Sequence, residues 1–152
     1  MKYRRATIED VHILTDLRIE FLIEANGQQF EHENALKEKI ESYFNYHLHT
    51  EEFVAWLCIS DDTVVGTSGI SFYEIPPSYS NFTGWIGYIM NMYTRKPYRR
   101  KGIGSFLFQK ILEEGRKKNV SKFILNATHD GKGLYEKFGF ALSGDEMHLV
   151  VR

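Results

Sequence analysis

Residues 84–125 contain the pattern that most constrains the fold of this chain. A run of β-branched and aromatic residues, GWIGYIMNMYT, is followed by the turn YRRKGIG at residues 98–104 and then by apolar residues at helical spacing. A second apolar run, KFILNA, begins at residue 122. A strand, a helix and a strand in this order form a right-handed crossover between parallel strands. The order therefore predicts one parallel strand pair joined by an amphipathic helix.

Strand signals elsewhere favour antiparallel neighbours for this pair. Residues 52–60 and 63–75 are rich in β-branched and aromatic side chains and flank an Asp-Asp turn, which predicts a hairpin. Two shorter strands are expected at residues 2–7 and 146–152. We therefore expect an α+β fold built on a mixed, mostly antiparallel sheet.

The spacing of apolar residues predicts four helices. The first begins after Thr7, which forms a capping-box pattern with Asp10, and it ends at Gly27. The other three are expected at residues 33–48, 103–117 and 133–139. No repeat, low-complexity tract or linker divides the sequence, so residues 1–152 are expected to form a single domain.

Composition argues against several classes of protein. The 152 residues are 43% hydrophobic, which is enough for one core and unlike a disordered chain. With 19 basic and 20 acidic residues, the chain lacks the positive charge of a protein whose main partner is nucleic acid. Cys58 is the single cysteine and no Cys or His spacing matches a zinc site, so we expect a reducing compartment and no metal. Charges interrupt the apolar residues near the N-terminus and no apolar run is long enough to cross a membrane, so we expect a cytoplasmic protein.

The turn at residues 98–104 has the features of an anion site. The first amides of a helix have no intrahelical partner, and the helix dipole adds partial positive charge there. Gly102 and Gly104 leave room for a ligand, and three cations at residues 99–101 add full charge. This combination suits a diphosphate, although the sequence is neither a Walker loop nor a three-glycine dinucleotide motif. An ordinary turn at the start of a helix is the alternative.

Two motifs resemble those of the GNAT (Gcn5-related) N-acetyltransferases. The turn matches the family's Arg/Gln-x-x-Gly-x-Gly/Ala segment through Arg99, Gly102 and Gly104. The stretch ILNATHDGKGLYEKFGF at residues 124–140 resembles a later motif, in which an Asn near a strand end precedes a short helix with Leu-Tyr-Glu-Lys. The resemblance implies a splayed parallel strand pair with helices on both faces of the sheet. It also implies that acetyl-CoA binds in the gap between these strands and gives its acetyl group to an amine.

The resemblance also implies roles for individual residues. The cofactor-binding positions lie in the turn, at the end of the preceding strand and after the following strand. They are Arg99, Arg100, Lys101, Gly102, Ile103, Gly104 and Ser105 for the diphosphate, Met92, Tyr93 and Thr94 for the pantetheine arm, and Asn126 for the pantetheine or the lower arm of the cofactor. For Asn126 the alternative is a residue that caps or bridges a strand end. Tyr135 is expected near the thioester sulfur as the proton donor, with a purely structural core position as the alternative.

The acceptor amine must lose a proton before it attacks. An alkyl amine has a pKa of roughly 10.4, so only about one molecule in a thousand is neutral at pH 7 without a base or a desolvating pocket. Many relatives have a Glu on the strand before the turn. Here Asn91 holds that position in the predicted catalytic centre, where it can hydrogen-bond but cannot accept a proton. The remaining candidate bases are Glu24, Glu74, Glu146 and His129.

The acceptor is expected to be a small-molecule amine. The acidic segment 16–34 favours a cationic acceptor such as a polyamine, an aminoglycoside or lysine, while an amino acid with a free α-amine fits as easily. Arg18 and Glu24 are the predicted substrate contacts, with a solvated helix face as the alternative. The aromatic segment 42–49 is expected to pack the second helix and to line an acceptor pocket or a homodimer contact.

Two other functions fit the sequence. A non-catalytic acyl-CoA sensor would bind the cofactor without turnover, and the missing strand carboxylate favours it. A nucleic-acid-binding module would use the five cations of RKPYRRK, at residues 95–101, to contact phosphates, although the near-zero net charge argues against it.

Overall fold

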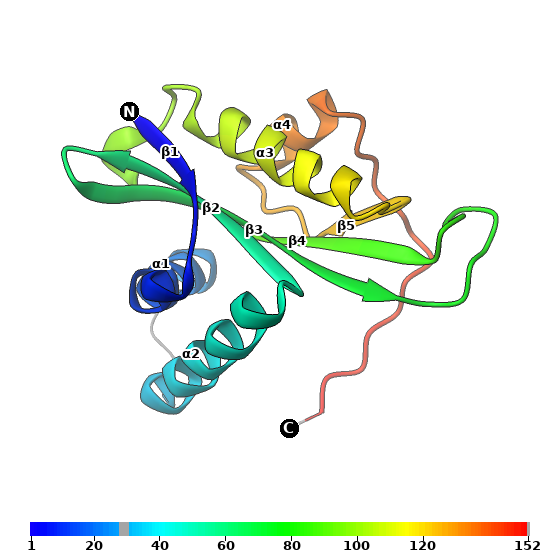
Figure 1. The fold of residues 1–152 in the computed structure, drawn as a ribbon, viewed down its shortest axis with the longest axis horizontal. Helices are drawn as coiled ribbons and strands as arrows, with labels where there is room; N and C mark the ends of the chain where they lie inside the picture. Colours follow the sequence, from blue (N-terminus) through cyan, green and yellow to red (C-terminus); the bar gives the residue numbers. More distant parts are fainter. Residues whose placement is uncertain (28–30, 152) are drawn as a thin grey trace.

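One five-stranded sheet separates two layers of helices in the computed structural model, which describes residues 1–27 and 31–151 (Figure 1). The strands lie side by side in chain order, as β1 (Lys2–Arg5), β2 (Phe53–Ser60), β3 (Thr63–Glu74), β4 (Trp85–Thr94) and β5 (Lys122–Leu125). Strands β1 to β4 pair antiparallel, whereas β4 and β5 pair parallel. The predicted α+β fold with one parallel pair is confirmed.

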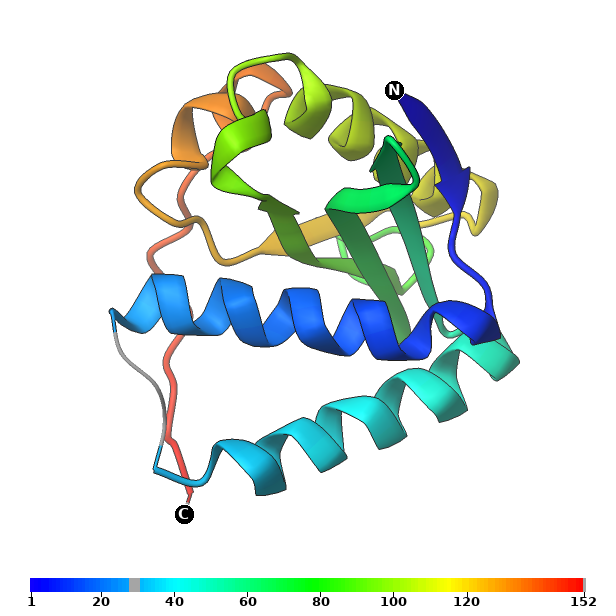
Figure 2. The same cartoon turned by 90° about the vertical axis from the view of Figure 1, so that its left-hand side faces the viewer.

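The helices cover both faces of the sheet. Helices α1 (Val11–Asn26) and α2 (Glu33–Thr50) lie on one face, and α3 (Ile103–Lys117) and α4 (Lys132–Lys137) lie on the other (Figures 1 and 2). Two short 3-10 helices, η1 (Ile8–Asp10) and η2 (Lys96–Tyr98), precede α1 and α3. This layering leaves the C-terminal end of β4 and the start of α3 next to each other at one end of the sheet (Figure 2).

The sequence of β2 explains why the sheet is covered on both faces. Phe53 and Leu57 belong to the core under α1 and α2, while Val54 belongs to the core under α3 and α4. Successive side chains of a strand point to opposite faces, so an uninterrupted apolar run requires cover on both. The run FVAWLC meets this requirement.

Local signals fix the start of η1, which runs directly into α1, and the end of α1. Thr7 accepts from the backbone of Glu9, and the Asp10 carboxylate accepts from the Thr7 amide at 2.7 Å, so the predicted capping box is present. Gly27 ends the helix with a φ of 75°, and its amide donates to the Ile23 carbonyl at 2.8 Å. A left-handed residue after the last turn is the common way for a helix to stop, and glycine adopts it without strain.

The predicted strand at residues 146–152 is wrong over its described part. Residues 141–151 contain no strand, and residue 152 lies outside the described residues. The side chains of Met147, Leu149 and Val151 are exposed. Alternating apolar residues form a strand only when they pair with a neighbouring strand. No described strand pairs with this segment, although β5 is an edge strand with one partner.

Two further features are absent from the described part of the chain. Within residues 1–27 and 31–151, no helix is both long and apolar enough to cross a membrane. The same ranges contain no group of three or more His, Cys, Asp or Glu side chains placed to hold a metal ion.

The capping box at Asp10 predicts an acid-sensitive contribution to stability. Arg4 donates two hydrogen bonds to this carboxylate, at 2.7 and 2.9 Å, and this contact lowers the pKa of Asp10 below its ordinary 3.8. Removing the cap with Asp10→Ala should reduce the free energy of unfolding at pH 7 by about 1–2 kcal/mol, measured by urea denaturation. Because the folded-state pKa is depressed, this difference should be complete above the unfolded pKa and should shrink as the pH falls through the folded value.

The matched control is Glu9→Ala, which removes an exposed carboxylate from the same turn. Its free energy of unfolding should change by less than about 0.5 kcal/mol at either pH. An equal loss of stability in the two variants, or a loss for Asp10→Ala that does not depend on pH, would contradict this account of the cap.

Candidate active site

The parallel strands β4 and β5 separate after a short paired segment. Their pairing runs from Ile86 with Lys122 to Ile89 with Leu125, and β4 then continues to Thr94. Over residues 90–94, β4 therefore has no described strand on the β5 side. Its backbone there has no strand partner, although Arg99 Nε donates to the Thr94 carbonyl. The predicted splayed pair is confirmed.

A β-bulge at Asn91 turns the end of β4. Thr67 and Gly69 of β3 face Tyr93 and Met90 of β4, so β4 has one residue more than β3 between these rungs. Asn91 has a φ of 58°, a left-handed conformation that Asn adopts more readily than most residues. The bulge changes the alternation of side chains, since Met90 packs in the core under α1 and α2 and Met92 in the core under α3 and α4.

The turn before α3 presents free backbone amides. Among the described residues, none of the amides of residues 100–105 donates to a protein acceptor. Gly102 is the N-cap residue with a φ of 81°, and no side chain caps the helix. A Cβ at Gly102 would meet no atom within 4 Å, and one at Gly104 only Leu134 at 3.8 Å. The space above these amides is open, so the turn fits a diphosphate.

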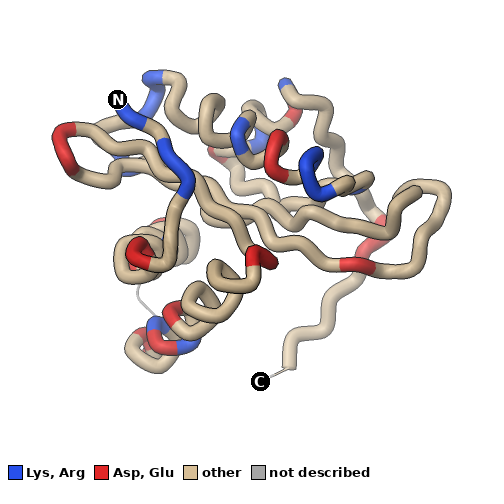
Figure 3. The backbone as a smooth tube through the Cα atoms, viewed as in Figure 1, with Lys and Arg blue, Asp and Glu red and all other residues tan. Residues whose placement is uncertain are grey.

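The basic residues of the turn fall into two groups. Arg99 folds back, since its Nε donates to the Thr94 carbonyl at 2.6 Å and its Nη2 pairs with Glu24 at 2.8 Å. Arg100 and Lys101 form no ion pair with any described residue. Figure 3 shows basic residues, in blue, in the loop before α3. Arg99 therefore braces the end of β4, and the next two cations remain available for an anion.

Tyr135 lies between α3 and the loop after β5. It is only 7% exposed, and its ring packs against Phe108 with the centroids 5.1 Å apart. Burial raises the pKa of Tyr135, so the phenol stays protonated at neutral pH. Its hydroxyl forms no hydrogen bond with a described residue and can donate to a ligand.

Asn126 follows the last paired rung of β5. Its Nδ2 donates to the Tyr88 hydroxyl on β4 at 2.6 Å. This bond links the two strands just where they begin to separate. Tyr88 was not among the predicted site residues, because no motif distinguishes it from the other aromatic residues of β4.

A cavity of about 310 Å³ lies on the other side of β4, between α1 and α2. Its lining consists of two basic, two aromatic and two apolar side chains, which are Arg18, Lys39, Tyr43, Phe44, Ile40 and Met90. Arg18 Nη1 donates to Asn91 Oδ1 at 2.6 Å, which joins this pocket to the bulge. Asn91 is 2% exposed, and its Nδ2 has no partner among the described residues.

The aromatic segment 42–49 contributes Tyr43 and Phe44 to the lining of this cavity. The Tyr43 hydroxyl hydrogen-bonds Ser71 on β3, and burial raises the pKa of Tyr43. Lys39 and Met90 were not predicted from the sequence, because neither belongs to a motif.

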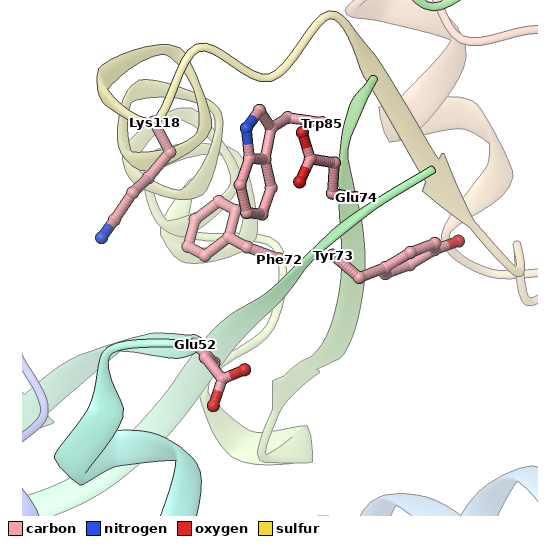
Figure 4. A pocket seen from close by; sticks show the side chains of 6 residues that line it. All are labelled: Glu52, Phe72, Tyr73, Glu74, Trp85 and Lys118. Carbon is pink, nitrogen blue, oxygen red and sulfur yellow. The ribbon is translucent and has the colours of Figure 1, made fainter. Parts of the chain in front are cut away.

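The candidate bases lie in different parts of the molecule. Glu24 is bound to Arg99, and Glu146 lies 2.6 Å from His148 on the exposed C-terminal segment. His129 is exposed in the loop before α4. Glu74 lines a second cavity, of about 410 Å³, together with Trp85 at the opposite end of β4 from Thr94 (Figure 4). None of the four lines the pocket beside Asn91.

Comparison with known proteins agrees with this geometry. The Acetyltransferase (GNAT) family matches residues 14–140. A predicted acetyltransferase from Clostridium acetobutylicum, crystallised with acetyl-CoA, is 30% identical, with a TM-score of 0.91 over 98% of this chain and 95% of that one. No curated protein matched the sequence.

Two further solved structures share the fold. A GCN5-related N-acetyltransferase from Ralstonia eutropha is 23% identical, with a TM-score of 0.89 over 99% of this chain and 97% of that chain. A ribosomal-protein-alanine N-acetyltransferase from Brucella melitensis is 22% identical, with a TM-score of 0.66 over 100% and 99% of the two chains. The splayed strands, the open amides and the family match together identify the chain as a member of the GNAT acetyltransferase family.

Proposed function

We propose that the protein is an acetyl-CoA-dependent N-acetyltransferase. The acetyl group passes directly to a primary amine of a small molecule while both substrates are bound. One observation carries the proposal: the free amides of residues 100–105 lie beside a strand end whose backbone has no described strand on the β5 side. The family match supports acetyl transfer from acetyl-CoA.

The backbone performs most of the binding in this proposal. Bound acetyl-CoA supplies an activated thioester. The amides of residues 100–105 hold the diphosphate, with Arg100 and Lys101 adding charge at the rim. The free edge of Met92, Tyr93 and Thr94 pairs with the pantetheine arm, and an amide of Met92 or Tyr93 donates to the developing oxyanion.

The acceptor pocket lowers the pKa of the amine without a carboxylate base. No carboxylate is among its six lining residues. Desolvation disfavours the charged ammonium, and so does the positive charge of Arg18. Asn91 accepts from Arg18 and keeps a donor without a described partner at the bulge, so it orients groups but does not take the proton. Water carries the proton away.

Tyr135 is the proposed proton donor to the leaving sulfur. Its raised pKa keeps the phenol protonated, and its hydroxyl has no competing partner among the described residues. The substrate contact proposed for Glu24 has less support, because this carboxylate already pairs with Arg99.

Two further functions are less well supported. A non-catalytic acyl-CoA sensor would use the same turn and strand edge, and a pocket lining without a carboxylate base is compatible with binding in the absence of turnover. A nucleic-acid module is the least favoured, because Arg95 and Arg99 are already paired with Glu20 and Glu24. A single domain, a cytoplasmic location and a homodimer remain predictions.

The decisive test is an assay of CoA release from acetyl-CoA with a panel of amines. We expect acetylation of at least one class of small amine, with both substrates required in one complex. Calorimetric binding of CoA without turnover for any amine would support the sensor. Salt-sensitive retardation of duplex DNA without affinity for CoA would support the nucleic-acid module.

Gly104→Asp tests the proposed diphosphate site. Position 104 lies in the first turn of α3, where a carboxylate interacts favourably with the helix dipole. The same carboxylate would repel the diphosphate and fill the open space above the amides. We therefore expect at least about 100-fold weaker binding of acetyl-CoA in calorimetry, with an unchanged or higher melting temperature.

Gly104→Ala is the matched control, because its methyl group meets only Leu134 at 3.8 Å. Its affinity for acetyl-CoA should fall much less than that of Gly104→Asp. Unchanged affinity in Gly104→Asp would show that the diphosphate binds elsewhere.

Tyr135→Phe tests the proton donor. The ring keeps its packing on Phe108, so the fold and the cofactor site should survive. We expect kcat to fall by about 10²-fold while the Kd for acetyl-CoA changes less than about threefold. Wild-type kcat in this variant would remove Tyr135 from the mechanism.

A further inference from the structure

The charges around the acceptor pocket do not match the cationic acceptor that the acidic segment 16–34 favours. Residues 28–30 of that segment lie outside the described residues. On α1, Glu20 pairs with Arg95 at 2.7 Å and Glu24 with Arg99 at 2.8 Å. These two carboxylates are therefore already neutralised by arginines that belong to the end of β4 and the following turn.

The pocket itself is lined by cations. Arg18 and Lys39 are its two charged residues, and neither forms an ion pair with any described residue. The rest of the lining is apolar or aromatic. A cationic acceptor would meet repulsion from Arg18 without a compensating carboxylate.

Arg18 differs from the other arginines beside the sheet. Arg4 and Arg95 each bind a carboxylate, and this contact is the main cause that raises the pKa of each. For Arg18 the main cause is burial, which lowers the pKa. Arg18 is partly buried and has no counter-ion among the described residues, so a bound anion at this position would be stabilised.

Most of the hydrogen-bonding capacity of Arg18 is unused. A guanidinium has five N–H donors, and the described residues accept from one of its nitrogens, Nη1, through Asn91. The planar fork matches the two oxygens of a carboxylate. Asn91 adds a buried Nδ2 donor that also has no described partner. A buried donor of Asn91 and the guanidinium N–H groups of Arg18 that have no described protein partner thus meet at the bulge, where the acetyl group is proposed to be transferred.

We propose that the acceptor is a small amine that also carries a carboxylate on an apolar body, and that Arg18 binds this carboxylate. This inference rests on the proposed function. A volume of about 310 Å³ suits a molecule of amino-acid size, and Ile40, Phe44 and Met90 provide contacts for an apolar side chain. Arg18 is thus a specificity-determining residue rather than part of a solvated helix face.

The test compares amines that differ only in the carboxylate. Leucine and phenylalanine would each be assayed with acetyl-CoA beside their amides and their decarboxylated amines, together with β- and γ-amino acids and a polyamine. We expect the best carboxylate-bearing amine to have a kcat/KM at least about 30-fold above its amide and its decarboxylated counterpart. The amide is a stringent comparison, because its amine is less basic and is more often neutral at pH 7.

Arg18→Gln should reduce kcat/KM for carboxylate-bearing amines by about 100-fold, mainly through KM, and should leave the Kd for acetyl-CoA unchanged. Glutamine can still donate to Asn91, so the bulge keeps its neighbour. The kcat/KM of Arg18→Lys should lie between those of Arg18→Gln and the wild type, because lysine keeps the charge but cannot bind both carboxylate oxygens as the planar guanidinium does. Lys37→Gln is the control for charge, since Lys37 pairs with Asp16 on the exposed helix surface and does not line the pocket.

The outcomes separate this inference from the proposed function. Equal or faster acetylation of the amides, decarboxylated amines or polyamine would overturn the carboxylate assignment and leave the acetyltransferase intact. If no amine is acetylated, the proposed acetyltransferase activity is rejected. Calorimetry with N-acetyl amino acids and their amides then tests whether the pocket binds a carboxylate. Tighter binding of the acids that is lost in Arg18→Gln would support the anion site, and equal binding would overturn it.

Discussion

The parallel pairing of β4 with β5 stops after Ile89, and the rest of the candidate site depends on this break. Pairing beyond Ile89 would satisfy the backbone of residues 90–94 within the sheet and leave no edge for a ligand. The bulge at Asn91 turns the end of β4, so that Met90 packs toward α1 and α2 and Met92 toward α3 and α4. The same short segment therefore supplies both the proposed cofactor edge and, through Met90, the lining of the proposed acceptor pocket.

Ion pairs from α1 hold this end of β4. Arg95 is fixed by Glu20 and Arg99 by Glu24, and Arg99 also donates to the Thr94 carbonyl. The Arg95–Glu20 pair is partly buried and uses two guanidinium nitrogens, and such a pair defines geometry better than an isolated surface pair. Their second effect is to remove negative charge from the groove, which leaves Arg18 as an uncompensated cation beside the bulge.

Much of the fold was predictable from the sequence because its signals are local. The capping box at Thr7, the glycine stop at Gly27 and the apolar spacing after Gly102 depend on neighbouring residues only. The predicted strand at 146–152 failed because a strand also needs a partner, and the alternating pattern does not say whether the segment pairs with one. The turn at residues 98–104 could likewise be predicted as the start of a helix from Gly102 and Gly104. The pairing of Glu24 with Arg99 and the isolation of Arg18 could not, because they join residues far apart in the chain.

An NMR titration of the labelled protein with CoA tests the central claim most directly. The claim is that free amides at the start of α3 and along the end of β4 bind the cofactor. It predicts that the amides of residues 100–105 and 92–94 show the largest chemical-shift changes, with saturation at one equivalent. Saturable binding of CoA that leaves these amides unchanged and shifts another region would contradict it.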